Sequence, residues 1–205
     1  MNEQIEHWNQ RFSREDYLFG KEPNEFLVSQ AQRFSAGMRV LSVADGEGRN
    51  GVWLAGQGLD VLAVEAAPLA VEKARRLAAD RGVMLAHECA DLLTWDWGVE
   101  RFDAIVAIFI QFLSPEQRPQ IFEKMQAALK PGGVLLLEGY RVEQLAYGTG
   151  GPRDVAHLYS EELLRSAFAG LEILHLAGYD APIEEGSGHS GMSALIDLVA
   201  RKPSA

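Results

Sequence analysis

Disulfides, basic tracts and long apolar stretches are scarce or missing in this sequence. It has one cysteine, Cys89, which excludes an internal disulfide and is typical of a reducing compartment. Its net charge is −10 and its lysines and arginines are scattered, whereas binding to a nucleic-acid backbone needs concentrated positive charge. We find neither a signal-peptide pattern nor an apolar stretch of membrane-spanning length. We therefore expect a cytoplasmic protein without a nucleic-acid or membrane partner.

Length and composition favour a single α/β domain over residues 1–205. The chain has 205 residues, of which 47% are hydrophobic and 23% charged, and this leaves no room for a separate substrate domain. Residues 1–36 are predicted to form an N-terminal helical cap, because Trp8 and Phe12 share one helix face and Asn24 can cap a second helix. The simplest role of these aromatic side chains is packing.

Residues 39–65 are the most informative segment and read as strand, glycine turn, helix, strand and carboxylate. An apolar run ends at Asp45-Gly46-Glu47-Gly48, helical spacing resumes at once, and a second strand ends on Glu65, 19 residues after Gly46. Such a turn brings bare backbone N–H groups to a ligand, and a carboxylate ending the next strand can bind a ribose diol. The segment therefore predicts a site for a nucleoside cofactor.

Two cofactors fit this segment. The spacing Gly46-x-Gly48-x-x-Gly51 formally satisfies the dinucleotide fingerprint, which would indicate an NAD-type Rossmann oxidoreductase. Alternatively, Gly46-Glu47-Gly48 is the turn of an S-adenosylmethionine (SAM) site, which holds no pyrophosphate and needs no third glycine. Glycines are frequent at strand–helix turns for steric reasons, so the pattern alone does not decide.

The rest of the chain continues the alternation of strands and helices. A helix is predicted from Pro68 to Gly82, and a capping box at Ser114 begins another that reaches Leu129. The remaining predicted strands are Val83–Glu88, Phe102–Phe109, Val134–Glu138, Leu171–Leu176 and Ser193–Arg201. A loop over Pro182–Gly191 would join the last two.

Over nearly its whole length the chain resembles the class I SAM-dependent methyltransferases. The resemblance rests on the glycine turn, Glu65, Asp91, the segment Leu129–Gly133 and the C-terminal strand pair. It implies a doubly wound Rossmann-like sheet of order 3-2-1-4-5-7-6 with strand 7 antiparallel. It also implies SAM as cofactor and S-adenosylhomocysteine as product, with Asp91 bound to the adenine amino group and Leu92 offering a backbone N–H. The cofactor-binding residues so predicted are Arg11, Tyr17, Ala44, Asp45, Gly46, Gly48, Glu65, Ala66, Asp91, Leu92 and Ile108.

Within this class the chain is similar to small bacterial members of the tellurite-resistance and thiopurine methyltransferase-like branch. The front motif is Trp8-Asn9-x-Arg11-Phe12 with Tyr17-x-x-Gly20-x-x-Pro23-Asn24, and the back motif is Glu185-Gly186-x-Gly188-His189. Ser42 stands where the class commonly has Asp, and Asp45 where it has a small residue. Asp45 can supply the negative charge toward the methionine amino group that Ser42 lacks. The alternative is that the chain is a SAM-binding domain without catalysis.

The branch resemblance implies that the front segment closes over the methionine end of SAM. Tyr17 would present an aromatic face to the sulfonium. Arg11 would either bind the methionine carboxylate or pair with Glu15, and the sequence does not decide between these two roles. Aspartates in loops often bond their own backbone, which is the alternative for Asp91.

The acceptor is expected to be a small molecule, possibly a thiol or chalcogen oxyanion, methylated by SN2 transfer. Its pocket would use Phe109–Phe112 after the fourth strand, Tyr140 and Arg141 after the fifth, and His189 with Glu184 and Glu185 in the late loop. We predict Tyr140 and His189 as catalytic residues; the alternative for His189 is a mobile surface hairpin.

His87 and Cys89 share a strand face but are too few for a metal site, so none is predicted. A monomer or weak homodimer is expected.

Overall fold

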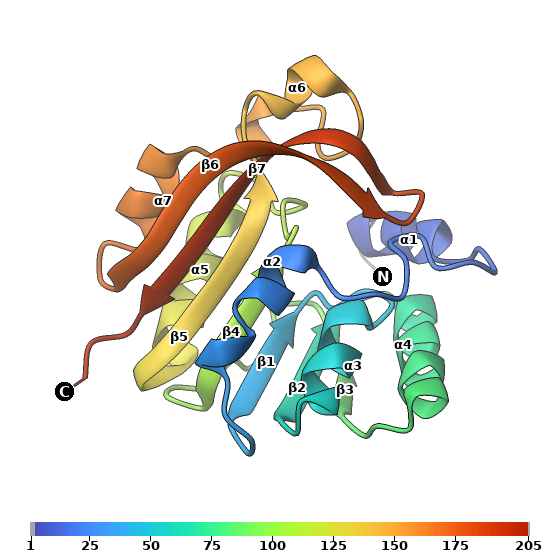
Figure 1. Ribbon diagram of the computed structural model, residues 1–205, viewed down its shortest axis with the longest axis horizontal. Helices are drawn as coiled ribbons and strands as arrows, with labels where there is room; N and C mark the ends of the chain where they lie inside the picture. Colours follow the sequence, from blue (N-terminus) through green and yellow to red (C-terminus); the bar gives the residue numbers. More distant parts are fainter. Residues whose placement is uncertain (1–2, 205) are drawn as a thin grey trace. The chain divides into compact units, whose positions relative to one another are not determined.

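One seven-stranded mixed sheet of order β3-β2-β1-β4-β5-β7-β6 organises the protein (Figure 1). The computed structural model describes residues 3–204. The strands are β1 (Arg39–Val43), β2 (Asp60–Glu65), β3 (Ala86–Cys89), β4 (Phe102–Ile108), β5 (Leu129–Tyr140), β6 (Glu172–Glu185) and β7 (His189–Arg201). Strand β7 runs antiparallel to β5. The order and the antiparallel strand confirm the fold class predicted from the sequence.

Helices connect most of these strands. They are α1 (Glu3–Arg11), α2 (Glu25–Ser29), α3 (Arg49–Gly56), α4 (Pro68–Arg81), α5 (Gln117–Ala128), α6 (Gln144–Tyr147) and α7 (Glu161–Ala167), with 3-10 turns at Ala31–Arg33 and Val155–His157. No helix within residues 3–204 is long and apolar enough to cross a membrane.

The described residues group into two compact units. Unit 1 contains residues 3–95 together with Glu185–Gly188, and unit 2 contains residues 96–184 and 189–204. The turn between β6 and β7 therefore belongs to unit 1, while the two strands belong mainly to unit 2.

In unit 1, β1, β2 and β3 form a parallel sheet whose neighbours α3 and α4 contact each other (Figure 1). As predicted, α4 has Pro68 in its first turn and ends at Gly82, whose φ of +67° is left-handed. Strand β3 starts at Ala86 and not at Val83, so that prediction was wrong in its bounds. The reason is that the backbone N–H of Val83 donates to the carbonyl of Ala78 and closes the helix.

In unit 2, β4 pairs in parallel with β5, which extends further than predicted. The register shifts between Phe102↔Leu129 and Ala104↔Val134, so the residues predicted as a loop form an irregularity inside β5. The capping box before α5 is present, since Ser114 and Gln117 each donate a backbone N–H to the other's side-chain oxygen.

The loop predicted over Pro182–Gly191 is mostly strand. Strands β6 and β7 form a long curved hairpin (Figure 1) whose connection is only three residues, Gly186 to Gly188. Pro182 lies in β6, which is the edge strand of the sheet, and edge strands are where proline occurs in sheets. His189 is consequently the first residue of β7 and does not lie in a loop.

Candidate functional site

The glycine turn after β1 is built from residues with left-handed backbone. Ala44, Gly46 and Gly48 have φ values of +50°, +57° and +93°. A Cβ on Gly48 would lie 2.8 Å from the Cα of Ala74 in α4, so only glycine fits there. Ala44 adopts this conformation without being glycine, which is a mark of local strain at a site. The turn leads directly into α3, whose first N–H groups need partners.

Glu65 at the end of β2 is bonded to this turn. Its Oε2 accepts a hydrogen bond from the N–H of Gly46 at 3.0 Å, and its Oε1 accepts one from Ala67 at 2.8 Å. Burial raises the pKa of Glu65, and the bonds from Ala67 and Gly46 oppose that rise. Each carboxylate oxygen can accept a further hydrogen bond. The geometry therefore leaves Glu65 able to accept from a diol while it fixes the turn.

Asp45 and Ser42, the two departures from the class pattern, are bonded to each other. Oδ1 of Asp45 accepts from the Ser42 hydroxyl at 2.5 Å and from the N–H of Gly51 at 2.9 Å. Its Oδ2 is buried without a partner among the described residues. Burial raises the pKa of Asp45 to about 7.

The same carboxylate explains the third glycine of the pattern. A Cβ on Gly51 would lie 2.5 Å from Oδ2 of Asp45. Gly51 is therefore needed to make room for the Asp45 side chain. The third glycine of the pattern has this packing reason and does not by itself indicate a dinucleotide.

Asp91 and Leu92, predicted near the adenine, follow β3. Oδ1 of Asp91 accepts from the N–H of Leu93 at 3.0 Å, the local bond that loop aspartates often make. Leu92 is buried. Ala66 lies beside the end of β3, since its carbonyl accepts from the Cys89 thiol. The adenine role of Asp91 stays a prediction.

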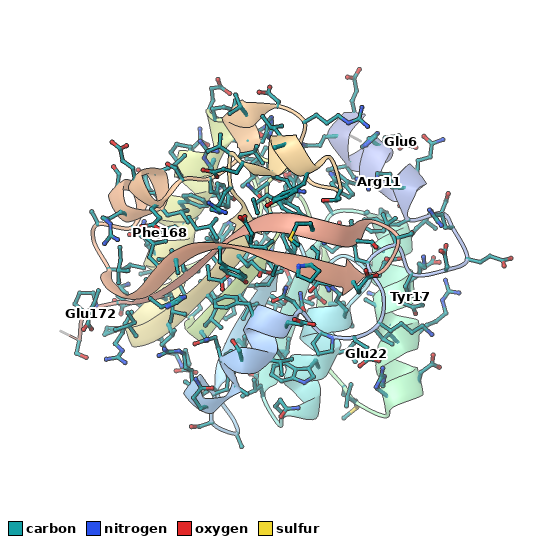
Figure 2. All side chains as sticks on the ribbon, turned by 45° about the horizontal axis from the view of Figure 1, so that its top comes forward. Glu6, Arg11, Tyr17, Glu22, Phe168 and Glu172 are labelled. Carbon is teal, nitrogen blue, oxygen red and sulfur yellow. The ribbon has the colours of Figure 1, made fainter. Side chains whose placement is uncertain are left out.

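Arg11 and Tyr17, predicted to close over the cofactor, both contact aromatic or helical neighbours in unit 1 (Figure 2). The Arg11 guanidinium lies 4.5 Å from the Trp8 ring centroid, and burial lowers its pKa. It forms no pair with Glu15 in the part of the chain described. The Tyr17 hydroxyl donates to the carbonyl of Lys73 at 2.9 Å, so this end of the residue is anchored to α4.

The sequence interpretation missed a buried ammonium group that holds the front segment. Lys73 is 4% exposed and pairs with the buried carboxylate of Glu47 in the glycine turn. Its Nζ also donates to the carbonyls of Phe12, Arg14 and Asp16, the last at 2.6 Å. The available signal was a lysine on the apolar face of α4.

It also missed a buried network that joins the two branch motifs. The side chain of Arg49 pairs with Glu185 at 2.7 Å, and the other carboxylate oxygen of Glu185 accepts from the Asn24 amide at 3.0 Å. Asn24 also caps α2, as predicted, by accepting from the N–H of Leu27. Glu185 was expected beside the acceptor; the structure instead uses it to fasten the hairpin turn within unit 1.

In unit 2, three rings gather at the carboxyl ends of β4 and β5. Phe109 lies 4.8 Å from Tyr140 and 4.3 Å from His189 between ring centroids, and Tyr140 lies 5.6 Å from His189. Phe109 has a φ of +54°, which is costly for an aromatic residue and places its ring against the other two. His189 is only 7% exposed, so the surface-hairpin alternative was wrong.

The other expected wall residues are occupied by contacts within unit 2. The Gln111 amide bonds both the N–H and the carbonyl of Tyr140. Ile108, predicted to bind the cofactor and not the acceptor, is buried at the end of β4. Arg141 pairs with Asp180 and with Glu143, which neutralises the one cation predicted for this pocket. The exposed Glu184 accepts from Ser190.

A carboxyl pair in the same face of unit 2 was also missed. Glu138 and Asp197 lie directly opposite each other in the β5–β7 ladder, and both are buried. The hydroxyl of Tyr179 donates to Glu138 at 3.2 Å. Burial raises the pKa of Asp197 to about 6. The signal was an acid in the apolar run of each strand, Val134–Glu138 in β5 and Ala194–Ala200 in β7.

No group of three or more His, Cys, Asp or Glu side chains within residues 3–204 could hold a metal ion.

Residues 40–133 match the family model described as a methyltransferase domain. Among curated proteins, the carboxy-S-adenosyl-L-methionine synthase of Geobacter metallireducens is 33% identical over 108 residues, or 51% of this chain and 40% of that protein. The chain thus spans about two-fifths of that relative's length.

Two solved structures share the fold along most of this chain. The N-methyltransferase NodS of Bradyrhizobium japonicum, in complex with S-adenosyl-L-homocysteine, has a TM-score of 0.75 at 16% identity and covers 98% of this chain and 100% of its own. TehB of Haemophilus influenzae has a TM-score of 0.71 at 18% identity, with coverages of 97% and 67%. The methyltransferase domain matched over residues 40–133 and the fold shared with these structures agree with the class that the sequence predicted, the class I SAM-dependent methyltransferases, whose cofactor is SAM.

Proposed function

We propose that the protein transfers the methyl group of SAM to a small-molecule acceptor. The observation that carries the proposal is the bond between Glu65 and the N–H of Gly46, which joins a diol-binding carboxylate to the glycine turn of β1. A carboxylate and a nucleoside-binding turn fixed to each other define a site for a ribose-bearing cofactor.

The residues of unit 1 fit SAM on two further counts. The buried Oδ2 of Asp45 has no partner among the described residues and suits a cationic amino group. Arg11 is a half-buried cation over Trp8 that can bind a carboxylate. When bound, SAM supplies an activated methyl group on a sulfonium that leaves readily. The chain therefore needs chiefly to orient the acceptor and exclude water from it.

In unit 2, Phe109, Tyr140 and His189 form the surface that we assign to the acceptor. Two aromatic rings suit a soft or apolar body, and the imidazole can take a proton from a thiol. A thiol or chalcogen oxyanion remains our proposed acceptor, and a base is needed only when the acceptor carries a proton. Because the chain has a net charge of −10, we do not propose RNA or DNA as acceptor.

The relatives favour a second candidate, the synthesis of carboxy-SAM, on the strength of 33% identity over 108 residues. That product carries an additional carboxylate, which a free cation would best hold. Arg141 in unit 2 is already paired with Asp180 and Glu143, so we favour methyl transfer. The bond between Ser42 and Asp45 also argues against a domain that has lost catalysis, since each residue compensates for the other's departure.

The test is transfer of radiolabelled methyl from SAM to a panel of thiols, selenite, tellurite and small carboxylates, with S-adenosylhomocysteine measured as product. Label in a small acceptor supports the proposal. Methyl label found only in RNA would contradict it. Conversion of SAM into a product that has gained a carboxylate would contradict it too. Stabilisation by NAD and not by S-adenosylhomocysteine in a thermal melt would contradict the cofactor assignment as well.

A further inference from the structure

In unit 2, the chain of β4 turns away from β5 just before the end of β5. The parallel register of the two strands runs to Ile108↔Glu138, and Phe109 then takes its left-handed φ of +54°. The N–H of Phe109 still donates to the carbonyl of Glu138 at 2.8 Å. The next backbone groups on this edge of β5 belong to Tyr140, which is buried, so they need partners other than β4.

The side-chain amide of Gln111 supplies these partners. Its Oε1 accepts from the N–H of Tyr140 at 2.5 Å, and its Nε2 donates to the carbonyl of Tyr140 at 2.9 Å. A side-chain amide carries the donor and the acceptor of a peptide group, so it continues the ladder in place of a strand residue. Gly139 leaves room for it, since a Cβ there would lie 2.8 Å from Oε1 of Gln111.

Gln111 also holds the 3-10 turn at Val155–His157. Its Nε2 donates a second bond to the carbonyl of His157 at 3.1 Å, and Nδ1 of His157 lies 3.1 Å from the carbonyl oxygen of Gln111. That oxygen can only accept, so Nδ1 of this histidine carries the proton. One buried side chain therefore joins the end of β4 to two segments that lie 29 and 46 positions further along the chain.

These bonds hold the rings that we assign to the acceptor. Phe109 precedes Gln111 by two residues, and Tyr140 is held through both of its backbone groups, so the amide fixes the 4.8 Å between the two ring centroids. We infer that Gln111 is the positioning residue of the acceptor surface, which sets Phe109 and Tyr140 against His189 without itself contacting the acceptor. The inference rests on the proposed function for what this surface does, and on the hydrogen bonds for what holds it.

Gln126 offers a matched control in unit 2. Its Nε2 also donates to two backbone carbonyls, those of Phe122 in α5 and Ala167 in α7, each at 3.2 Å. Gln111→Met and Gln126→Met therefore each remove an amide that joins two segments. Only the first removes one that is bonded to Tyr140.

The NMR signal of the His189 ring tests the inference without any acceptor. In protein with ring-labelled histidine, this signal is the one that disappears in His189→Gln. The ring currents of Phe109 and Tyr140, whose centroids lie 4.3 and 5.6 Å away, displace it from the position of an isolated imidazole. Gln111→Met should move the signal toward that position, and Gln126→Met should leave it in place. An unmoved signal in folded Gln111→Met would overturn the inference.

A second variant carries the same test if Gln111→Met does not fold. Gln111→Glu keeps an oxygen for the N–H of Tyr140 but turns the donor into an acceptor that faces two carbonyls. It should move the His189 signal as well, and an unmoved signal in this variant would overturn the inference in the same way.

Methyl transfer to thiophenol, a thiol with a flat apolar body, gives the kinetic readout. Gln111→Met should lower kcat/KM about 10²-fold, because misplaced rings no longer orient the acceptor, while the affinity for S-adenosylhomocysteine stays unchanged. Gln126→Met should keep the wild-type kcat/KM. Equal kcat/KM in the two variants, or a loss of S-adenosylhomocysteine affinity in Gln111→Met alone, would overturn the positioning role. Absence of transfer by the wild type would count against the proposed acceptor class, and the His189 signal would still decide whether Gln111 holds the rings.

Discussion

Asn24 and Glu185 are separated by 161 positions in the chain, and their side chains share a buried hydrogen bond of 3.0 Å. Around them, Gly188 donates a backbone N–H to the carbonyl of Leu18, and an added Cβ on Gly186 would strike the backbone at Gly20. The front and back motifs of the branch are therefore the two sides of one contact. Their glycines are required because two turns of backbone approach closely, which gives these motifs a packing reason as well as a functional one.

Replacing Glu65 should weaken SAM binding. Glu65→Ala removes both diol acceptors and releases the N–H of Gly46, so affinity should fall about tenfold or more, from about 1.5–3 kcal/mol per charge-assisted bond. Isothermal titration with SAM measures it. Asp60→Ala, which removes an exposed carboxylate from the other end of β2, is the matched control. Equal SAM affinity in both variants would refute the assigned site.

Asp45 should make stability depend on pH. Its folded pKa of about 7 lies above the unfolded value, so the folded state holds the proton longer, and stability is highest below about pH 4 and falls as pH rises to about 7. The loss is on the order of 4 kcal/mol at 1.36 kcal/mol per pKa unit. Urea unfolding of wild type and Asp45→Asn across this range checks it. Asp197 contributes the same slope to both proteins, so their difference isolates Asp45. If stability changes with pH in the same way in both proteins, the pKa of Asp45 is not raised by folding and the prediction is wrong.

Removing Lys73 should release the front segment. Lys73→Met leaves the Glu47 carboxylate buried and unpaired and frees the carbonyls of Phe12, Arg14 and Asp16, at a cost of about 3–5 kcal/mol. Hydrogen exchange of residues 12–19 should accelerate.

The control for Lys73 is Lys130→Met, which breaks a partly exposed pair with Asp103 and should cost less than about 1 kcal/mol. The double variant Lys73→Met with Glu47→Gln should recover part of the loss. A separate measurement on the wild type tests the closure that the sequence predicts. If hydrogen exchange of residues 12–19 slows when S-adenosylhomocysteine binds, the segment closes over the cofactor. Unchanged exchange in Lys73→Met would show that this lysine does not hold the segment.

Replacing His189 should slow transfer without changing SAM affinity. If the imidazole takes the acceptor's proton, His189→Gln should lower kcat about 10²–10⁴-fold and change the pH profile of kcat. Glutamine is chosen because it is polar and similar in size to histidine but cannot take the proton. His175→Gln, on the exposed side of β6, is the control. A loss confined to KM with an unchanged pH profile would make His189 a packing residue.

Local pattern in the sequence was sufficient for the glycine turn and the carboxylate at Glu65, whereas the strand order came from the family resemblance. The turn and the carboxylate depend on neighbours a few residues apart, where periodicity and turn chemistry act directly. It was insufficient for the length of β6 and β7, because an edge strand with Pro182 and four nearby glycines has the composition of a loop.

The tertiary structure alone decided which charges are buried and with whom. Lys73 meets Glu47 across 26 positions, and Arg49 meets Glu185 across 136. A buried charge is stable only beside its partner, and the folding of distant segments against each other determines which residue that partner is. For the same reason the sequence left the role of Gly51 open, and the structure shows the Asp45 carboxylate beside it. The sequence specified the glycine turn after β1, and packing specified the contacts that hold it.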